Sequence, residues 1–360
     1  MHKNFKNIDK VVYGRGSFDN MDSILAEKRN ENDKFFLFIV DNYFKGKPLE
    51  KRIPLKPEDV LMFIDVDPEE PTTEQIDNIR DSILKTKGLP AGIVGIGGGS
   101  IMDIAKASSL MFTNEGSSTR YQGLNLIKKP GIYHLGVPTI SGTGAECSMT
   151  AVLTGPEKKL GLKCDWTVFN QVILDPDLIA TVPPDKWFYT GMDTYIHCIE
   201  SENGILNNAF SHSYAEQALK LCREVYINEG CGQNATNDDK LMVASLMGGL
   251  SLTYSEVGVC HALSYGLSKI KHMPHCWANC IVFQHLEDYY GEGVKEFKKM
   301  IALHKIELPN GLAKHVWTEE EITAMAHVAY NLSHMWNHAI GADWKEKITI
   351  DTIKDLYKRL

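Results

Sequence analysis

The sequence lacks a basic excess, a CxxC cysteine pair and an apolar run long enough to span a membrane. Its 360 residues carry 38 Lys and Arg against 46 Asp and Glu, a formal net charge of -8 at pH 7. This balance disfavours nucleic acid or an anionic membrane surface as a main partner. No signal-peptide or membrane-span pattern follows the polar first residues. We therefore expect a soluble protein that stays in the cytoplasm.

The eight cysteines are scattered along the chain. In a chain of this size, such a pattern is typical of reduced, mostly buried thiols rather than of a disulfide framework. Cys276 and Cys280 lie four residues apart beside His275, which leaves a thiolate zinc site as an alternative. Because their neighbours are aliphatic, we interpret both cysteines as part of a packed core.

In the first half of the chain, short apolar segments alternate with helical patterns. Strands are predicted at residues 35–40, 92–96, 132–137 and 172–178, and helices at 72–87 and from residue 101. This alternation predicts a parallel sheet with covering helices. With 43% hydrophobic residues the chain can bury a large core, and its length favours two domains. We place the first domain, an α/β dinucleotide-binding domain, at residues 1–180.

The second half shows helical spacing without a comparable strand. Pro183-Pro184 breaks the chain, and helices are predicted at residues 214–227, 238–254, 294–303, 318–334 and 350–360. Between the first two of these helices, residues 228–239 read as a polar loop. We therefore expect a helical domain at residues 181–360, in which His327, His334 and His338 are satisfied or exposed side chains rather than ligands.

Between the second strand and the next helix stands the glycine-rich turn Gly97-Gly98-Gly99-Ser100. Glycines at this place let backbone N–H groups reach a pyrophosphate at the positive end of the helix. A plain tight turn is the alternative, since Ser100 departs from the usual dinucleotide fingerprint. Asp41, at the end of the first strand, is the better candidate for the acid that binds the ribose. We count Asp103, in the following helix, among the cofactor-binding residues.

The segment Gly191-Met192-Asp193-Thr194-Tyr195-Ile196-His197-Cys198-Ile199-Glu200 places a carboxylate and an imidazole four residues apart on one helix face. His261 and His275 follow downstream, so one acid and three imidazoles could converge on one divalent ion. Such donors suit iron or zinc. For Asp193 and His197 alone, a favourable contact with the helix dipole is the alternative.

The same segment resembles the signature of iron-containing (group III) alcohol dehydrogenases, and His261 and His275 recur at a similar spacing to that family's later ligands. The resemblance implies the metal ligands Asp193, His197, His261 and His275, which are also the catalytic residues. It further implies a dehydroquinate synthase-like fold, with a Rossmann-like parallel-sheet domain followed by a helical one. Tyr265 stands where many members carry a further His, so a proton path through that position is in doubt.

A loop rich in hydroxyl groups, Pro138-Thr139-Ile140-Ser141-Gly142-Thr143-Gly144-Ala145-Glu146-Cys147-Ser148, follows the third strand. It is similar to the family's second cofactor loop, with Ala145 in place of the usual Ser. The resemblance implies that Thr139, Thr143 and Ser148 contact the cofactor. It also places Lys159 near the nicotinamide ribose, although an isolated lysine most often faces solvent.

The resemblance implies a metal-dependent alcohol oxidoreductase in which the ion stabilises an alkoxide and a nicotinamide accepts the hydride. Within the family, the chain is similar to bacterial enzymes that oxidise the C8 alcohol of 3-deoxy-D-manno-octulosonate (Kdo), with NAD or oxygen as acceptor. The cationic segment 268–274 between two ligands could place Lys271 or His272 near the carboxylate of such a sugar. We expect a homodimer.

Three other functions stay open at this point. One is the oxidation of another small primary alcohol or diol by NAD. Another is a lyase similar to dehydroquinate synthase, although the usual metal set of that enzyme, one Glu and two His, differs from Asp193 with His197. The third is a non-catalytic metal or nucleotide sensor on the same scaffold.

Overall fold

The computed structural model describes residues 5–31, 34–66 and 70–360. The chain divides into two compact units, Met1–Ser141 with Ala145–Thr181, and Gly142–Gly144 with Val182–Leu360. Three residues of the hydroxyl-rich loop therefore group with the second unit. The assignment of cofactor binding to residues 1–180 and of metal binding to residues 181–360 stays a prediction.

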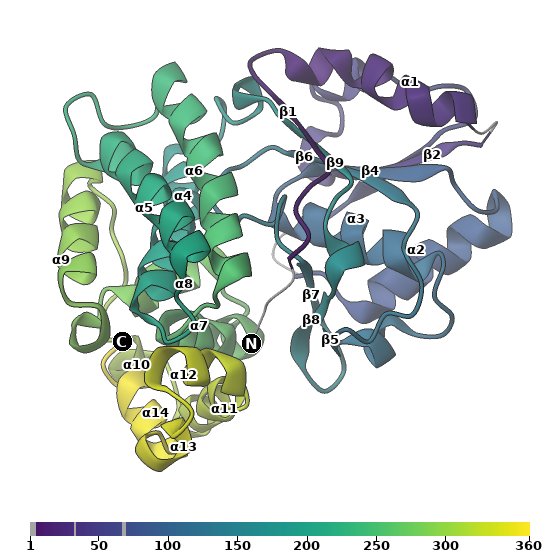
Figure 1. The fold of residues 1–360 in the computed structure, drawn as a ribbon. Helices are drawn as coiled ribbons and strands as arrows, with labels where there is room; N and C mark the ends of the chain where they lie inside the picture. The colour runs from purple at the N-terminus through teal and green to yellow at the C-terminus, as the bar shows by residue number, and fades with distance from the viewer. Residues whose placement is uncertain (1–4, 32–33, 67–69) are drawn as a thin grey trace. The chain divides into compact units, whose positions relative to one another are not determined.

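The first unit is built on a six-stranded sheet with the strand order β1-β9-β6-β4-β2-β3 (Figure 1). Its strands are β1 Lys10–Tyr13, β2 Phe36–Asp41, β3 Val60–Ile64, β4 Gly92–Gly97, β6 Tyr133–Pro138 and β9 Gln171–Leu174. All of its strand pairs are parallel. Strands β2 and β4 are almost wholly buried, as continuous apolar runs predict. The parallel-sheet prediction is confirmed.

The chain changes direction in this sheet between β2 and β4. From β2 it moves outward to the edge strand β3, and it then returns to form β4 on the other side of β2. In open parallel sheets, ligands bind at the carboxyl ends of the strands where such a reversal occurs. Asp41 is the last residue of β2, and Gly97 is the last residue of β4.

In the described part of the first unit, the α-helices are α1 Met21–Glu31, α2 Thr73–Thr86 and α3 Gly99–Met111. Helix α1 lies on one side of the sheet, and α2 and α3 lie on the other (Figure 1). Phe36, Phe38 and Val40, on one face of β2, share a buried cluster with Met21 and Leu25 of α1. Helix α2 confirms the helix prediction at residues 72–87. The Thr72 hydroxyl caps this helix by accepting a hydrogen bond from the N–H of Gln75.

A small second sheet and several short helices complete the first unit. The sheet has the order β5-β8-β7, with β5 Gly123–Leu124, β7 Thr150–Thr154 and β8 Lys159–Lys163. The 3-10 helices are η1 Ser17–Asn20, η2 Asn42–Phe44, η3 Glu50–Arg52, η4 Ser118–Tyr121, η5 Asp165–Thr167 and η6 Pro176–Leu178. The strand predicted at residues 172–178 is therefore too long. Strand β9 ends at Leu174 because the Asp175 carboxylate caps η6, which begins with a proline.

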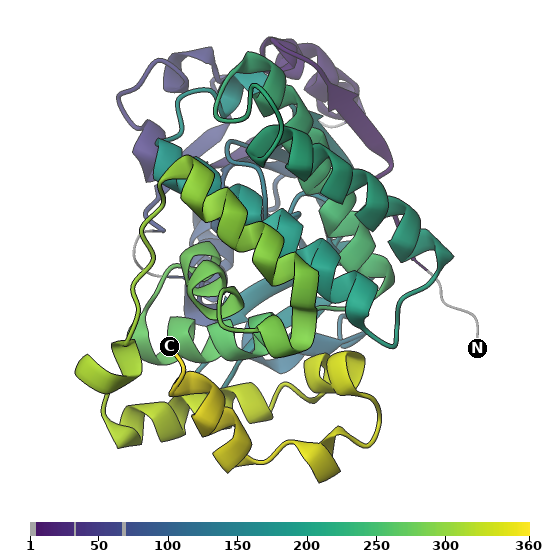
Figure 2. The same cartoon turned by 90° about the vertical axis from the view of Figure 1, so that its left-hand side faces the viewer.

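The second unit is helical, and residues 182–360 contain no strand. Its helices are α4 Pro184–Asn203, α5 Ala209–Tyr226, α6 Ala235–Tyr254, α7 Val259–Lys271, α8 His275–Phe283, α9 Glu287–His304, α10 Leu312–His315, α11 Glu319–Tyr330, α12 Ser333–Ile340, α13 Trp344–Lys347 and α14 Ile350–Tyr357 (Figure 2). Several predicted boundaries are wrong: α5 begins at Ala209 rather than at residue 214, and α9 begins at Glu287 rather than at residue 294. Helix α6 starts inside the predicted loop because Asn234 caps it, and residues 318–334 form two helices. Within the described ranges, no helix is long and apolar enough to cross a membrane.

Helix α4 is the central element of the second unit and is buried on nearly all sides. It packs against α5, α6 and α8. A Cβ atom at Gly191 would overlap the Tyr226 hydroxyl of α5, so this glycine permits the close approach of the two helices. A helix that is buried all round holds its side chains in fixed positions, which suits a ligand-bearing segment.

His134 in β6 gives the first unit a pH-sensitive group. Burial lowers the pKa of His134 from 6.5 to about 4, so the unfolded chain binds the proton more tightly. The neutral ring contributes fully to the free energy of unfolding above pH 6.5. This contribution is lost as the pH falls from 6.5 toward 4, by about 1.4 kcal/mol for each pH unit. We expect His134→Gln to flatten the fall of the urea midpoint over this range. A slope in His134→Gln equal to that of the parent would contradict the assignment.

Candidate metal and cofactor sites

The four predicted metal ligands lie together in the second unit. Asp193 and His197 project from α4, His261 lies in the first turn of α7, and His275 begins α8. Asp193 Oδ1 is 3.4 Å from His261 Nε2 and 3.6 Å from His197 Nε2, and Asp193 Oδ2 is 3.7 Å from His275 Nε2. The rings of His197 and His261 stack with centroids 4.7 Å apart. The i,i+4 spacing of Asp193 and His197 therefore places the carboxylate and the imidazole next to each other on one face of α4.

The donor atoms match the dimensions of a metal site. Asp193, His261 and His275 each place one donor within 4.8 Å of the other two. Ligands at about 2.0–2.1 Å from a tetrahedral ion lie about 3.4 Å apart, close to the observed separations. Asp193 and His261 are almost fully buried, and their donor atoms face one another at a separation at which a positive charge would be stabilised. The donor set fits a borderline divalent cation.

The electrostatics of this cluster also favour a cation. Burial raises the pKa of Asp193, but the three surrounding imidazoles outweigh burial and hold the carboxyl well below its usual range. Burial lowers the pKa of His197 to about 4, so this ring is neutral and can act as a ligand near pH 7. Burial acts in the same way on His261, but the carboxylates of Glu200 and Asp193 raise its pKa to about 9. The field at His261 therefore attracts positive charge.

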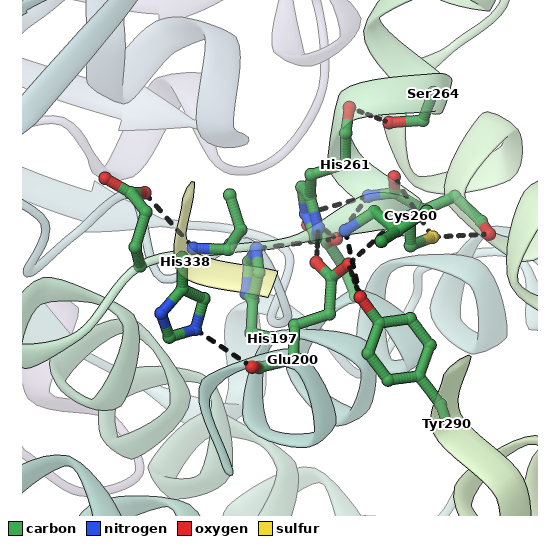
Figure 3. Close-up of polar contacts among 12 residues, drawn as sticks. His197, Glu200, Cys260, His261, Ser264, Tyr290 and His338 are labelled. Atoms are coloured by element: carbon green, nitrogen blue, oxygen red, sulfur yellow. Dashed lines mark hydrogen bonds and ion pairs between the residues drawn. The ribbon is translucent and has the colours of Figure 1, made fainter. Parts of the chain in front are cut away.

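Sequence reasoning missed two polar residues around the ligands. The side-chain amide of Asn279, in α8, donates a 2.7 Å hydrogen bond to Asp193 Oδ1 and lies 3.1 Å from His261 Nε2. The carboxylate of Glu200 accepts a hydrogen bond from His261 Nδ1 (Figure 3). Glu200 follows His197 by three residues on the ligand-bearing helix, which was a usable signal. Asn279 follows His275 by four residues and gave the same kind of signal.

The remaining predictions around the cluster have mixed outcomes. Cys280 is fully buried, as expected of a core thiol, whereas the half-buried Cys276 directs its thiol to Asp193 Oδ2 at 3.6 Å. Cys276 is therefore beside the ligands rather than simply in the core. His338 is buried and bonds to the Glu200 carbonyl oxygen, as the interpretation of a satisfied histidine requires. The Tyr265 ring packs edge-on against His275 with centroids 5.7 Å apart.

In the first unit, Asp41 and the glycine-rich turn lie side by side. A Cβ atom at Gly97 would come within 2.5 Å of the Ile101 side chain and 3.2 Å of Asp41 Cβ. Helix α3 begins at Gly99, directly after this turn, with Gly98 as its N-cap. The backbone N–H groups of Gly99 and Ser100 therefore stand at the positive end of α3. The arrangement can receive a diphosphate beside an acid that bonds to a ribose.

The predicted contacts Asp103 and Ser148 have partners inside the protein. Both meet the fully buried ammonium group of Lys106, which lies 3.4 Å from Asp103 Oδ1 and 3.2 Å from Ser148 Oγ. Lys106 also donates to the carbonyl oxygens of Ala145 and Thr150. The structure thus gives Asp103 and Ser148 a role in holding the hydroxyl-rich loop on α3. A direct contact of either residue with the cofactor stays a prediction.

Lys159 and the two threonines of the loop are also placed. Lys159 is buried in β8 and forms a 2.6 Å ion pair with Glu70, so the usual expectation of a solvent-facing lysine does not hold. The N–H of Thr139 donates to the carbonyl oxygen of Gly97, which joins the loop to the glycine-rich turn. Thr143 lies in the segment Gly142–Gly144, which belongs to the second unit. Cofactor contacts of all three residues stay predictions.

The segment Gly142–Gly144 packs directly on the ligand-bearing helix. The Gly142 carbonyl oxygen accepts a 2.7 Å hydrogen bond from the Thr194 hydroxyl, and its N–H donates to Ser245 Oγ at 2.8 Å. A Cβ atom at Gly142 would overlap the backbone carbonyl of Thr190. The backbone of the predicted cofactor loop is therefore fixed within one residue of Asp193.

The cationic segment between His261 and His275 makes contacts within the protein. Lys271, the last residue of α7, forms a 2.6 Å ion pair with Glu321. His272 follows in the left-handed conformation, with φ of 53°, and ends the helix. A substrate carboxylate at Lys271 would have to share this ammonium group with Glu321.

Comparison with known proteins covers nearly the whole chain. Residues 9–176 match the family described as iron-containing alcohol dehydrogenase, and residues 187–332 match the C-terminal part of the Fe-containing alcohol dehydrogenase family. A sulfoacetaldehyde reductase of Bilophila wadsworthia is 30% identical over 277 residues, 74% of this chain and 70% of the relative. The NAD-dependent methanol dehydrogenase of Bacillus methanolicus is 29% identical over 302 residues, 76% of this chain and 78% of the relative.

Solved structures agree in fold. A 1,3-propanediol oxidoreductase superposes with a TM-score of 0.83 at 20% identity, covering 99% of both chains. A sulfoacetaldehyde reductase from Bifidobacterium kashiwanohense in complex with NAD+ gives 0.79 at 21% identity, covering 99% of this chain and 98% of the other. The predicted fold class is confirmed. The chain belongs to the iron-containing alcohol dehydrogenase family and is a metal-dependent oxidoreductase that acts on CH–OH groups, with a divalent metal and NAD as cofactors.

Proposed function

We propose that this chain interconverts a primary alcohol and its aldehyde on a small anionic substrate. The metal ligands are Asp193, His197, His261 and His275, and NAD binds at the carboxyl ends of β2 and β4. The observation that carries the proposal is the buried carboxylate of Asp193 with three imidazole nitrogens 3.4–3.7 Å away. A metal ion held by these residues can take part in catalysis when a substrate oxygen also binds to it.

The chain's own residues prepare this reaction. When bound, the metal supplies a Lewis acid that favours the alkoxide form of the substrate alcohol. Asp193 remains ionised because its pKa is held well below the usual range, so it offers one negative charge to the site. The near-complete burial of Asp193, His197 and His261 excludes water from their side of the site. Exclusion of water strengthens each electrostatic contact there.

The cofactor is positioned by backbone groups and one acid. The N–H groups at the start of α3 would hold the diphosphate. Asp41 would accept hydrogen bonds from the ribose diol, since its carboxylate ends β2 beside Gly97. The Thr139 hydroxyl, next to the glycine-rich turn, and the Thr143 hydroxyl would each add a contact to the cofactor.

Asp41 predicts a preference for NAD over NADP. Its carboxylate would repel a 2'-phosphate, and like charges a few ångströms apart at a protein surface interact strongly enough to change affinity by about tenfold or more. We expect Asp41→Ser to raise the ratio of kcat/KM for NADP to that for NAD by at least about this factor. The exposed Asp19→Ser of the same unit is the control. An unchanged ratio in Asp41→Ser would remove Asp41 as the ribose partner.

The proposal also specifies the chemical class of the substrate. A relative acts on sulfoacetaldehyde, as its name states, and that compound joins an anionic group to a two-carbon aldehyde. Segment 268–274 of this chain adds Lys269, Lys271 and His272 near two of the ligands in sequence. We propose an acidic substrate, with 3-deoxy-D-manno-octulosonate oxidised at its C8 alcohol as the specific candidate.

A comparison of substrates tests this part. A charge-assisted contact to a carboxylate is worth about 1.5–3 kcal/mol, or roughly 10- to 150-fold. We expect kcat/KM for the acidic sugar to exceed that for a neutral polyol of similar length by such a factor. Lys271→Ala should reduce the preference, whereas Lys347→Ala, which removes a lysine paired with Asp343 at an exposed site, should not. Equal rates on both substrates in the parent would remove the acidic-sugar proposal.

Cofactor stoichiometry separates this function from the lyase alternative. A lyase similar to dehydroquinate synthase recycles its nicotinamide, so no net NADH accumulates. The proposed reaction forms one NADH for each alcohol oxidised, and the protein stripped with a chelator should do so only after Fe2+ or Zn2+ is returned. Substrate turnover without net NADH would contradict the proposal.

A further inference from the structure

The Glu200 carboxylate connects three helices behind the ligand cluster (Figure 3). Glu200 lies near the end of α4 and is 1% exposed. Its Oε2 accepts a hydrogen bond from His261 Nδ1. Its Oε1 accepts hydrogen bonds from the Cys260 N–H at 2.6 Å and from the Tyr290 hydroxyl at 2.8 Å. The buried His338 bonds to the Glu200 carbonyl oxygen at 3.0 Å, so the backbone of this residue is held as well.

These contacts determine which nitrogen of His261 carries hydrogen. The Cys260 N–H, the Tyr290 hydroxyl and His261 all donate to the Glu200 side chain, so it acts as an acceptor-only carboxylate. His261 Nδ1 must then carry the donated hydrogen. Nε2 is then the nitrogen left to bind an ion, and it lies 3.4 Å from Asp193 Oδ1 and 3.1 Å from the Asn279 amide nitrogen, on the side toward which a ligand must point.

The same carboxylate also fixes where His261 stands. Helix α7 begins at Val259 after Gly258, which provides no side-chain cap. The first N–H groups of a helix need acceptors from elsewhere. The Tyr290 hydroxyl accepts from the Val259 N–H at 2.9 Å, and Glu200 accepts from the Cys260 N–H. His261 directly follows Cys260. Glu200 therefore binds both the N-terminal end of α7 and the imidazole ring of His261, which lies in the first turn of that helix.

We propose that Glu200 is a positioning residue for the metal, acting through the tautomer and orientation of His261, whereas Tyr290 serves only the end of α7. This inference rests on the proposed metal site. The two residues share one hydrogen-bond network but differ in what they touch, because only Glu200 contacts a ligand. Their variants therefore separate an effect on the metal from an effect on helix stability.

Glu200→Gln is the informative substitution. Its amide oxygen can take the place that accepts from Cys260 and Tyr290, which turns the amide NH2 toward His261 Nδ1. An NH2 group can only donate, so His261 would carry its hydrogen on Nε2, the nitrogen that must bind the ion. In a serine protease, the corresponding Asp-to-Asn change leaves the geometry intact and traps the wrong tautomer. We expect a comparable trap here with little change in packing.

The experiment measures metal affinity rather than turnover. The dissociation constants for Zn2+ and Co2+ are determined by competition with a chromophoric chelator in the parent, Glu200→Gln and Tyr290→Phe, together with the thermal midpoint of each. Loss of a partner behind a ligand costs about 10- to 100-fold in affinity, and we expect Glu200→Gln to lose at least this much and to alter the visible spectrum of bound Co2+. Tyr290→Phe should lower the thermal midpoint while it keeps the parent affinity and spectrum.

Each other outcome has a definite meaning. Parent affinity in a folded Glu200→Gln, or equal losses of affinity in both variants, would overturn the inference and leave the metal site itself intact. A parent protein that bound neither ion would instead overturn the proposed function and the inference with it. If Glu200→Gln does not fold, Glu200→Asp replaces it. That variant keeps the charge on a shorter side chain, and we expect a smaller loss of affinity with the parent tautomer; an affinity equal to that of the parent would overturn the inference.

Discussion

His261→Ala and His275→Ala are each expected to abolish stable metal binding and to lower kcat/KM for alcohol oxidation by more than about 100-fold. Loss of a group behind the ligands already costs about 10- to 100-fold, and loss of a ligand leaves an incomplete shell around the ion. The two side chains come from different helices, α7 and α8, so a shared folding defect does not explain a shared loss. Elemental analysis of the purified variants and steady-state kinetics are the measurements.

His212→Ala is the control for these two variants. His212 is exposed and pairs with Glu202 at the surface of the second unit, so its removal should leave metal content and activity unchanged. Thermal midpoints show whether the ligand variants are folded. A full complement of metal in both ligand variants, with activity retained, would contradict the assignment of these residues.

Gly142→Ala is expected to destabilise the second unit by more than about 4 kcal/mol, beyond the usual range for single substitutions. Its φ of 150° is unfavourable for alanine, and the added Cβ atom would overlap the backbone carbonyl of Thr190. A backbone group in a buried helix cannot turn aside as a flexible side chain can. Because Thr190 lies one turn before Asp193, the displacement should also lower metal affinity. Denaturant unfolding and metal titration are the measurements.

Gly14→Ala provides the matched control. Gly14 has a similar φ of 136°, but a Cβ atom there meets no heavy atom within 4 Å. This variant should show only the cost of the backbone conformation, about 1–2 kcal/mol. Equal destabilisation by the two substitutions would mean that the contact of Gly142 with α4 is unimportant.

Buried strands of the sheet could be predicted from the sequence because burial on both faces leaves a continuous apolar run. Strands β2, β4 and β6 have such runs. The edge strand β1 is exposed at Val11 and Tyr13, and β3 is only half-buried along its length. Strand β1 has only four residues and includes Lys10, whereas β3 is wholly apolar in sequence and was missed all the same. Strand β7 alternates buried and half-buried residues, but it is too short for alternation to distinguish it from a loop.

The ligands could be predicted because their spacing within each helix and the family resemblance both indicate them. The groups that support the ligands depend on which helices pack together, and the sequence pattern does not give that. Glu200 and Asn279 lie on the ligand-bearing helices α4 and α8 at helical spacing from His197 and His275, which is a signal in the sequence, but their contacts with His261 depend on how α7 packs against these helices. Lys106 reads as an ordinary helical lysine in the sequence, yet it is fully buried and holds the hydroxyl-rich loop. The predicted roles of Asp103 and Ser148 omit this lysine.

Anomalous diffraction from crystals of the metal-loaded protein with NAD tests the central claim most directly. Data collected above and below the absorption edge of the loaded metal locate that ion without reference to activity. We expect one strong peak bonded to a carboxylate oxygen of Asp193 and to Nε2 of His197, His261 and His275, at about 2.0–2.2 Å. A peak at Cys276 and Cys280 instead, or no peak within the side chains of the second unit, would contradict the account.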